Sequence, residues 1–210
     1  IRAAVARGTD WLVRTQDHQG AFRNAGGYGT SPVAMTSLAG IALLAGGSTP
    51  TRGAEWRTVR ATVDWLLRQQ DRDTGLIAVR GEDGVPMFGH GFATQFLAHV
   101  HGMEEDRQQQ QRLQAVLQRA VRLIEASQSA AGGWYYSPDA NDDEGSVTVT
   151  QLQALRACRQ AGIVVDARTV QRAVDYLRRS QNADGGVRYR LSIPGESRPA
   201  ITAASIASLF

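Results

Sequence analysis

The chain of 210 residues contains no lysine, a single cysteine and no long apolar run. One cysteine, Cys158, excludes an internal disulfide and a multi-cysteine metal site. It stands in an apolar helical pattern, which predicts a buried and unreactive thiol. No segment approaches the roughly 18 consecutive apolar residues that a membrane-spanning helix needs. None of these absences assigns the protein to a compartment.

Because lysine is absent, arginine supplies all the strongly basic side chains, and the formal net charge is only +3. A nucleic-acid-binding protein gathers its basic residues on one face. Here the arginines are spread along several predicted helices: Arg57, Arg60, Arg68, Arg112, Arg119, Arg122, Arg172, Arg178 and Arg179. This pattern favours a solvated outer surface, and we expect no nucleic-acid partner.

Four segments of the chain repeat one pattern around a glutamine. They are VARGTDWLVRTQDHQGAF, VRATVDWLLRQQDRDTGLI, LQRAVRLIEASQSAAGGW and VQRAVDYLRRSQNADGGV. Apolar residues four and eleven positions before each glutamine, with mostly apolar residues at seven, share one face of an α-helix. A glycine four or five positions after it fits a helix stop and a turn with positive φ.

The residues that mark this pattern have a predicted structural role. We expect Trp11 and Trp65 to pack between helical layers, and the glutamines to bond free backbone groups at helix ends. The signature consists of Trp11, Gln16, Trp65, Gln70, Gln128, Tyr176 and Gln181.

Each unit also has a second stretch that is rich in small residues and poor in charge. These stretches are SPVAMTSLAGIALLAGG, GHGFATQFLAHVHGM, SVTVTQLQALRACRQAGI and ESRPAITAASIASLF. A helix that is apolar almost all round is a buried one. The sequence therefore predicts an all-α domain of about eight main helices, arranged as four hairpins over residues 1–50, 51–104, 105–164 and 165–210.

A single hairpin cannot bury its own inner face, so neighbouring hairpins must stack. The fourth inner stretch stops in mid-pattern at residues 207–210 without a C-cap, and the first outer helix is expected to begin almost at residue 1, which suggests an array truncated at both ends. We therefore expect either further repeats or a homo-oligomer formed through the open ends, with Phe210 as a contact residue.

The W-L-x3-Q-x3/4-G pattern resembles the repeats of squalene-hopene cyclases and of protein prenyltransferase β-subunits. Two stretches, MFGHGFATQFLAHVHGM and GGWYYSPDANDDEGSVTVTQLQALRACRQAG, look still more like uncharacterised bacterial prenyltransferase/squalene-oxidase repeat proteins. The resemblance implies an α/α-toroid, here a partial ring, whose inner helices surround a central cavity. It does not assign an activity, because this architecture hosts several unrelated ones.

A class II terpene cyclase of this superfamily would need a D-x-D-D motif whose middle acid protonates an alkene. The acidic segment here gives two incomplete frames. The frame from Asp139 places Asn141 at the donor position, and the frame from Asn141 places Asp143 there but lacks the first aspartate. Asp139, Asp142 and Asp143 are the candidate acids of such an enzyme, and the other interpretation is a solvated loop that caps the next helix.

The zinc and phosphate motifs of other families are absent. No D-x-C precedes Cys158, and His99 and His101 are two residues apart, which puts them on different faces of a helix. The Gly26–Gly29 segment follows no predicted strand and is expected to be a simple link. We predict neither a metal nor another cofactor.

One group of residues remains as a candidate ligand site, in loops that enter the inner helices on the same face of a toroid. It contains Phe88, His90, Trp134, Tyr135 and Tyr136. Aromatic rings beside carboxylates can bind a sugar, a basic peptide or a cation. The competing interpretation is turn packing, with His90 as a capping residue.

The sequence thus favours a module that binds a small molecule, such as an isoprenoid, or a protein on its concave face without catalysis. The alternative is a divergent terpene cyclase that uses an acid of the 139–144 segment. A second alternative is a structural module that works by assembly through its open ends.

Overall fold

The computed structural model describes residues 1–23 and 30–209, which form eight α-helices and no β-strand. The 26–29 link and Phe210 lie outside these residues. The helices are α1 (Arg2–Thr15), α2 (Pro32–Ala45), α3 (Trp56–Arg68), α4 (Pro86–His101), α5 (Arg107–Ala126), α6 (Gly145–Gln160), α7 (Ala167–Arg179) and α8 (Pro199–Leu209).

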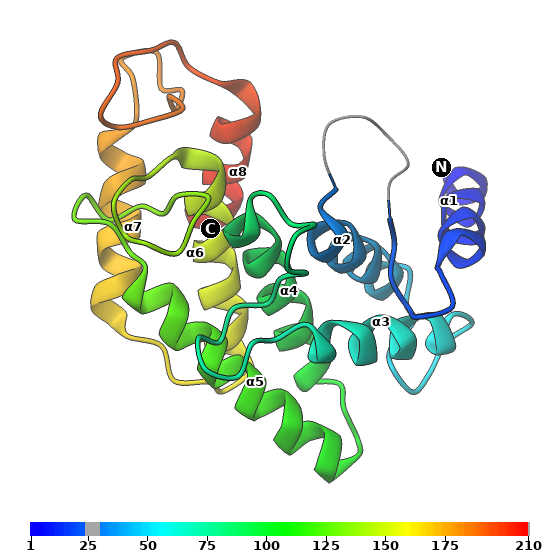
Figure 1. Cartoon of the computed structure of the whole chain (residues 1–210). Coiled ribbons are helices and arrows are strands. Elements are labelled where there is room, and N and C mark those ends of the chain that lie inside the picture. The colour runs from blue at the N-terminus through cyan, green and yellow to red at the C-terminus, as the bar shows by residue number, and fades with distance from the viewer. Residues whose placement is uncertain (24–29, 210) are drawn as a thin grey trace.

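The helices are arranged in two layers that follow an arc (Figure 1). The even-numbered helices form the inner layer, where α2, α4, α6 and α8 pack against one another in chain order. The odd-numbered helices lie outside them, and α1 and α7 stand at opposite ends of the arc. This is the α/α-toroid arrangement of four hairpins that the repeat pattern predicts.

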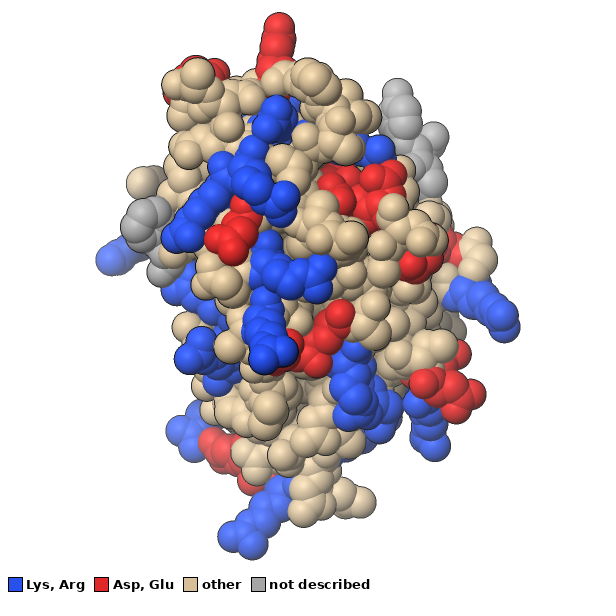
Figure 2. All heavy atoms as spheres, turned by 90° about the vertical axis from the view of Figure 1, so that its left-hand side faces the viewer, with Lys and Arg blue, Asp and Glu red and all other residues tan. Residues whose placement is uncertain are grey.

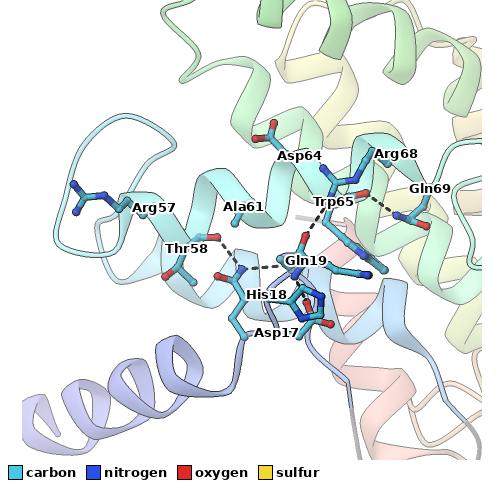
Figure 3. Close-up of a pocket in the computed structure, with 12 residues that line it drawn as sticks. Asp17, His18, Gln19, Arg57, Thr58, Ala61, Asp64, Trp65, Arg68 and Gln69 are labelled. Carbon is cyan, nitrogen blue, oxygen red and sulfur yellow. Dashed lines mark hydrogen bonds between the residues drawn. The ribbon is translucent and has the colours of Figure 1, made fainter.

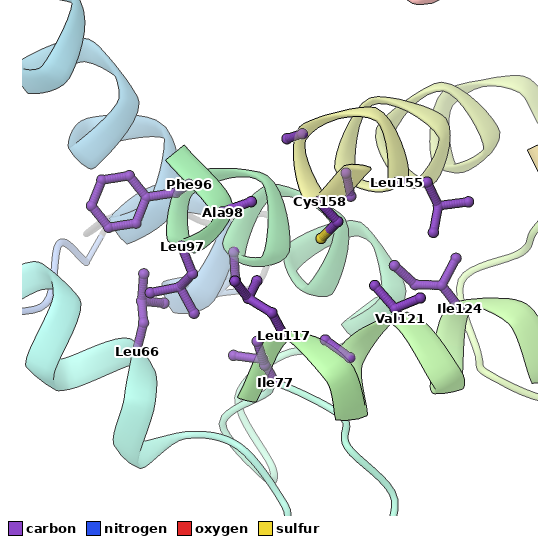
Figure 4. Close-up of a cluster of buried hydrophobic side chains, with 14 of the residues drawn as sticks. Leu66, Ile77, Phe96, Leu97, Ala98, Leu117, Val121, Ile124, Leu155 and Cys158 are labelled. Carbon is purple, nitrogen blue, oxygen red and sulfur yellow. The ribbon is translucent and has the colours of Figure 1, made fainter. Parts of the chain in front are cut away.

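The core lies between the two layers. Leu66 and Leu117 from outer helices meet Leu97, Leu155 and Cys158 from inner helices, all of them buried (Figure 4). Burial raises the pKa of the Cys158 thiol to about 12, so the thiol stays protonated and unreactive. This confirms the expected inert cysteine.

Small residues let the inner helices come close together. A Cβ on Gly40 of α2 would lie 2.6 Å from the ring of Phe96 in α4, and a Cβ on Gly91 of α4 would lie 2.7 Å from the side chain of Gln151 in α6. Side chains at either glycine would force the helices apart. The glycine and alanine content of the inner stretches therefore reflects helix–helix contact.

The signature glutamines join each repeat to the next one. In the first three repeats, the side-chain amide donates to the glycine carbonyl of its own turn and to a carbonyl in the following outer helix. The partners are Gly20 O (3.1 Å) and Thr58 O (3.0 Å) for Gln16, Gly75 O (3.1 Å) and Val116 O (2.9 Å) for Gln70, and Gly132 O and Thr169 O (both 2.9 Å) for Gln128. The sequence analysis expected the glutamines to bond backbone groups at helix ends. In the structure, their acceptors include carbonyl oxygens within the next outer helix.

The glycine of each turn makes this contact possible. Gly20, Gly75 and Gly132 have φ of 99°, 84° and 100°, as predicted for a turn that disfavours other residues. A Cβ on Gly132 would lie 2.5 Å from the carbonyl oxygen of Arg172 in the next outer helix. Figure 3 shows the first of these contacts, where the turn at 17–20 rests on α3 beside an open hollow of about 740 Å³.

A second repeated bond joins the turn to the inner helix. The backbone N–H two residues after the turn glycine donates to one polar side chain of that helix. The four pairs are Phe22 with Thr36 Oγ1 (2.9 Å), Ile77 with His90 Nδ1 (3.1 Å), Trp134 with Thr148 Oγ1 (3.1 Å) and Val187 with Thr202 Oγ1 (2.8 Å). His90 therefore occupies the position that threonine fills in the other three repeats.

His90 is fully buried, and its Nε2 lies 3.4 Å from the carbonyl oxygen of Ala120. Burial lowers the pKa of His90 to about 4. The neutral ring accepts the Ile77 N–H at Nδ1, which leaves Nε2 to donate to Ala120.

The large signature side chains divide into two groups. Trp65 and Tyr176 are buried as expected, with exposed fractions of 2% and 0%. Trp11 was expected in the same position between layers, but it is 57% exposed. Unlike α3, α1 has no buried residue in this structure.

The Gln128→Ala substitution should lower the free energy of unfolding by about 2–3 kcal/mol. It removes two buried hydrogen bonds, and the carbonyl oxygen of Thr169 loses its side-chain donor. The matched control is Gln181→Ala. Gln181 is exposed and, among the residues that the structure describes, donates to Gly185 O alone (2.9 Å), so its loss should cost less than about 1 kcal/mol. Urea unfolding at low micromolar protein concentration measures both, and equal losses would contradict the repeat-joining role.

His90 should make stability depend on pH. The unfolded chain binds a proton near pH 6.5 and the folded chain only near pH 4, so stability is complete above about pH 6.5 and falls as the pH drops toward 4. The loss should approach roughly 3 kcal/mol. His90→Thr keeps an acceptor and should remove this part of the pH dependence, measured by urea unfolding between pH 7.5 and 4.5. Parallel profiles for wild type and His90→Thr would contradict the assignment.

Candidate functional site

The inner face of the arc can be located from helix geometry. Thr36, His90, Thr148 and Thr202 point toward the outer layer, where they accept the turn N–H groups. Side chains two and five positions later are rotated by about 200° and 140°, toward the opposite side. These are Leu38, Phe92, Thr150 and Ala204, followed by Ile41, Gln95, Gln153 and Ala207.

The part of the inner face formed by α2 and α4 is apolar. Leu38 is 42% exposed, and Phe92 is partly exposed at the equivalent position of the next inner helix. Phe88 packs edge-on against Phe92, with ring centroids 5.2 Å apart. An exposed leucine on α2 and two partly exposed rings on α4 offer apolar surface on this side of the inner helices.

The part nearer the C-terminal ends of α4 and α6 is polar. A pocket of about 260 Å³ is lined there by Gln95, His99, Gln153 and Arg156, with Ala157, Gln160 and Ala207. Gln153 donates to Ser208 Oγ at 3.2 Å, which fixes one of its amide protons. Burial lowers the pKa of His99, so its ring is neutral near pH 7. The pocket thus presents amide and imidazole groups that both donate and accept.

At the other end of the inner helices, two loops form a rim. The loop before α6 contributes Tyr135, Tyr136 and Asp142, and the loop before α8 contributes Tyr189 and Arg190; we call these five residues the rim cluster. Arg190 lies 3.0 Å from an Asp142 carboxylate oxygen and 4.8 Å from the centre of the Tyr135 ring. The hydroxyls of Tyr136 and Tyr189 share a hydrogen bond.

The rim cluster is tied to the starts of α4 and α6. The carbonyl of Tyr189 accepts the Gly145 N–H at 2.7 Å, and the carbonyl of Tyr136 accepts the Met87 N–H at 3.1 Å. Burial, then the bond to Tyr136, raises the pKa of Tyr189, so its phenol stays protonated. The cluster presents aromatic rings and paired charges, and no activated nucleophile.

The sequence analysis identified Tyr135, Tyr136 and Asp142 in this region but missed Tyr189 and Arg190. These two residues follow the fourth repeat's turn, 53 and 48 positions after the partners that they contact. The sequence did hold a signal for Tyr189 and Arg190, because both loops lie directly before a predicted inner helix. Only the stacking of repeats brings the loops together.

The acidic segment sends its side chains in different directions. Asp139 is exposed and accepts bonds from Ser137 and Asn141 within its own loop. Glu144 is fully buried and accepts the backbone N–H groups of Ser146 (2.8 Å) and Val147 (2.6 Å), which caps α6 as the capping interpretation predicts.

Asp143 is also buried, and it belongs to the space between the layers. Its Oδ2 accepts from the Ser129 hydroxyl at 3.0 Å, and its Cβ lies against Gly133. Burial, and next the charge of Asp143, raise the pKa of Tyr176 from the outer helix α7. The carboxyl group of Asp143 thus has its described neighbours on the outer side of α6.

The five predicted ligand-binding residues do not form one site. Phe88 lies on the inner face, and Tyr135 and Tyr136 lie in the rim cluster. His90 and Trp134 are fully buried between the layers. The indole N–H of Trp134 donates to the carbonyl of Ile124 at 2.7 Å, which is a packing role.

The charge distribution agrees with the arginine pattern of the sequence. On the side of the molecule that carries α7, basic and acidic side chains are intermingled (Figure 2). Over residues 1–23 and 30–209, no helix is both long and apolar enough to cross a membrane, and no three histidine, cysteine or acidic side chains form a group suited to a metal ion.

No protein-family model matches the sequence, and no curated protein matches it. Among solved structures, a polysaccharide lyase is similar over 84% of this chain, with 17% identity and a TM-score of 0.59. The chain spans 58% of the length of that lyase.

Two further structures are similar over 99% of this chain. The type II terpene cyclase MstE from Scytonema has 16% identity and a TM-score of 0.43 over 71% of its length. A protein from Actinoplanes has 15% identity and a TM-score of 0.40 over 74% of its length. At 17% identity, the similarity to the polysaccharide lyase shows a similar helical fold and nothing further.

Proposed function

We propose that this protein is a binding module that holds a small amphipathic ligand on its inner face and does not transform it. The observation that carries the proposal is the division of that face into two parts. Leu38, Phe88 and Phe92 offer an apolar surface, and the pocket around Gln95 and Gln153 offers polar groups. One ligand with an apolar chain and a polar end can satisfy both.

The polar pocket indicates which kind of polar end would fit. Gln95, Gln153 and neutral His99 supply donors and acceptors, Arg156 adds guanidinium donors, and none of the residues that line this pocket is acidic. A hydroxyl or carbonyl group would be accommodated without an unpaired buried charge. An isoprenoid alcohol has this chemistry, with an unsaturated hydrocarbon chain and one hydroxyl.

The position of Asp143 supports binding rather than cyclisation. A cyclase of this architecture requires an acid directed at the hydrocarbon in the central cavity. The carboxylate of Asp143 instead contacts Ser129 and lies near Tyr176 on the outer side of α6. Asp142 lies in the rim cluster, where its carboxyl group contacts the Arg190 guanidinium at 3.0 Å.

Farnesol is a suitable probe, with binding measured by isothermal titration calorimetry. Phe92→Ala removes the central ring of the apolar part and should weaken binding at least roughly tenfold. Gln95→Leu keeps the size of the side chain but removes its hydrogen bonds, and should weaken binding by roughly five- to tenfold.

The matched control is Trp56→Ala, which removes a partly exposed aromatic ring from the outer layer and should leave the affinity unchanged. Asp143→Asn should also leave it unchanged. If Phe92→Ala binds farnesol as wild type does, the inner face is not the site. Conversion of farnesol or of a longer polyene by wild type, abolished in Asp143→Asn, would replace the proposal with the cyclase alternative.

A further inference from the structure

The inner helix α4 is open to the inside of the arc along a single stripe. Among residues 87–100, only Phe88, Phe92, Gln95 and His99 are partly exposed, and every other residue is buried. The four stand at intervals of four, three and four residues, which places them on one face of a helix. Because α2 and α6 pack against α4 on its two sides, this stripe lies in the middle of the arc (Figure 1).

The stripe changes its chemical character once along its length. Its first two residues are Phe88 and Phe92, whose rings pack edge-on with centroids 5.2 Å apart. Its last two are Gln95 and His99, which line the polar pocket of about 260 Å³. A ligand that lies along α4 therefore meets apolar surface at one end and hydrogen-bonding groups at the other.

The neighbouring inner helices agree with this division. Gln153 of α6 stands at the position equivalent to Gln95 and lines the same pocket. At the position equivalent to Phe92, α6 has Thr150, which is 4% exposed and bonds a carbonyl of its own helix. On the other side of α4, α2 has the exposed Leu38 at that position. The apolar and polar parts thus lie at different heights along α4.

The length of the stripe sets the length of chain that it can hold. An α-helix rises about 1.5 Å per residue, so Phe88 lies roughly 10 Å from Gln95 and roughly 16 Å from His99 along the axis. An extended hydrocarbon chain advances about 1.25 Å per carbon, given C–C bonds of about 1.5 Å at tetrahedral angles. A head group held between Gln95 and His99 therefore leaves room for a chain of about eight to thirteen carbons.

The stripe has a defined end at Phe88. The helix begins two residues earlier, at Pro86, and the Met87 N–H donates to the carbonyl of Tyr136 at 3.1 Å. The loop that carries part of the rim cluster therefore covers this end of α4. A chain that extends past Phe88 leaves the apolar surface for the polar groups of the rim, where added carbons gain little.

We propose that the ligand of the inner face is a single-chain amphiphile with a main chain of about twelve carbons, which lies along α4. Its polar end is held by Gln95 and His99, and the tip of its chain lies on Phe88. This inference rests on the proposed function, because it assigns the length and direction of the ligand within the same site. Farnesol, with a main chain of twelve carbons, meets the requirement.

The wild-type protein alone tests the length. Radiolabelled straight-chain primary alcohols with 6, 8, 10, 12, 14 and 16 carbons are measured by equilibrium dialysis. The dissociation constant should fall roughly two- to fourfold for each added carbon up to about twelve, because each methylene buries more apolar surface. From 12 to 16 carbons it should change by less than about twofold in total, because the added carbons lie beyond Phe88.

Two variants test the direction. Phe88→Ala removes the far end of the stripe, so it should weaken the binding of dodecanol roughly tenfold and that of octanol less than about threefold. Gln95→Leu removes a partner of the head group and should weaken both alcohols by the same roughly five- to tenfold. Trp56→Ala is the matched control, an aromatic-to-alanine change in the outer layer, and should leave both affinities unchanged. Circular dichroism verifies that each variant is folded.

A dissociation constant that keeps falling through 16 carbons would overturn the length limit and leave the proposed function standing. A ligand lying in the opposite direction would show an equal loss for both alcohols in Phe88→Ala and a loss confined to dodecanol in Gln95→Leu, and this result would also overturn the inference. If neither farnesol nor any alcohol of the series binds, the proposed function fails, and this inference fails with it.

Discussion

The structure depends on one contact, in which a glutamine amide bridges the turn of its own repeat and the outer helix of the next. The bridge works because the glycine in the turn has no side chain and its backbone has positive φ, so the turn comes within hydrogen-bonding range of a helix carbonyl. Each bridge sets how far one hairpin is rotated from its neighbour. Three such bridges in succession place the inner helices side by side along an arc.

The inner layer follows from this outer framework. Once the turns are held, a backbone N–H after each turn glycine bonds one polar side chain of the inner helix and fixes how that helix is rotated about its axis. That rotation decides which side chains face the neighbouring helices and which face the inside of the arc. Glycines such as Gly40 and Gly91 then permit close packing, and Phe92 and Gln95 are left on the open side.

The candidate ligand surface and the rim cluster rest on different parts of the same framework. The inner face offers a surface for a ligand because its residues need not pack against another helix. The rim cluster combines residues of the third and fourth repeats. Arg190 contacts Asp142 and Tyr135, and Tyr189 contacts Tyr136, across the boundary between these two repeats.

Much of the fold could be predicted from the sequence. The spacing of apolar residues around Gln16, Gln70, Gln128 and Gln181 predicted the outer helices, because helical periodicity is local. The charge-poor stretches predicted the inner helices for the same reason, and the turn glycines predicted where outer helices stop. The buried Cys158 and the capping of α6 by the acidic segment also followed from local pattern.

Only the tertiary structure decided what individual side chains do. His90 and Trp134 were candidate ligand-binding residues of the entry loops, but packing between the layers buries them: Trp134 contacts Ile124 of its own outer helix, and His90 lies beside Ala120 of the next repeat. Trp11 matched Trp65 in sequence, yet Trp11 is exposed and Trp65 is buried. The sequence by itself therefore determined the repeating unit, whose rules act within about twenty residues. The contacts between units, and with them the candidate site, depended on residues some fifty positions apart that only the fold brings together.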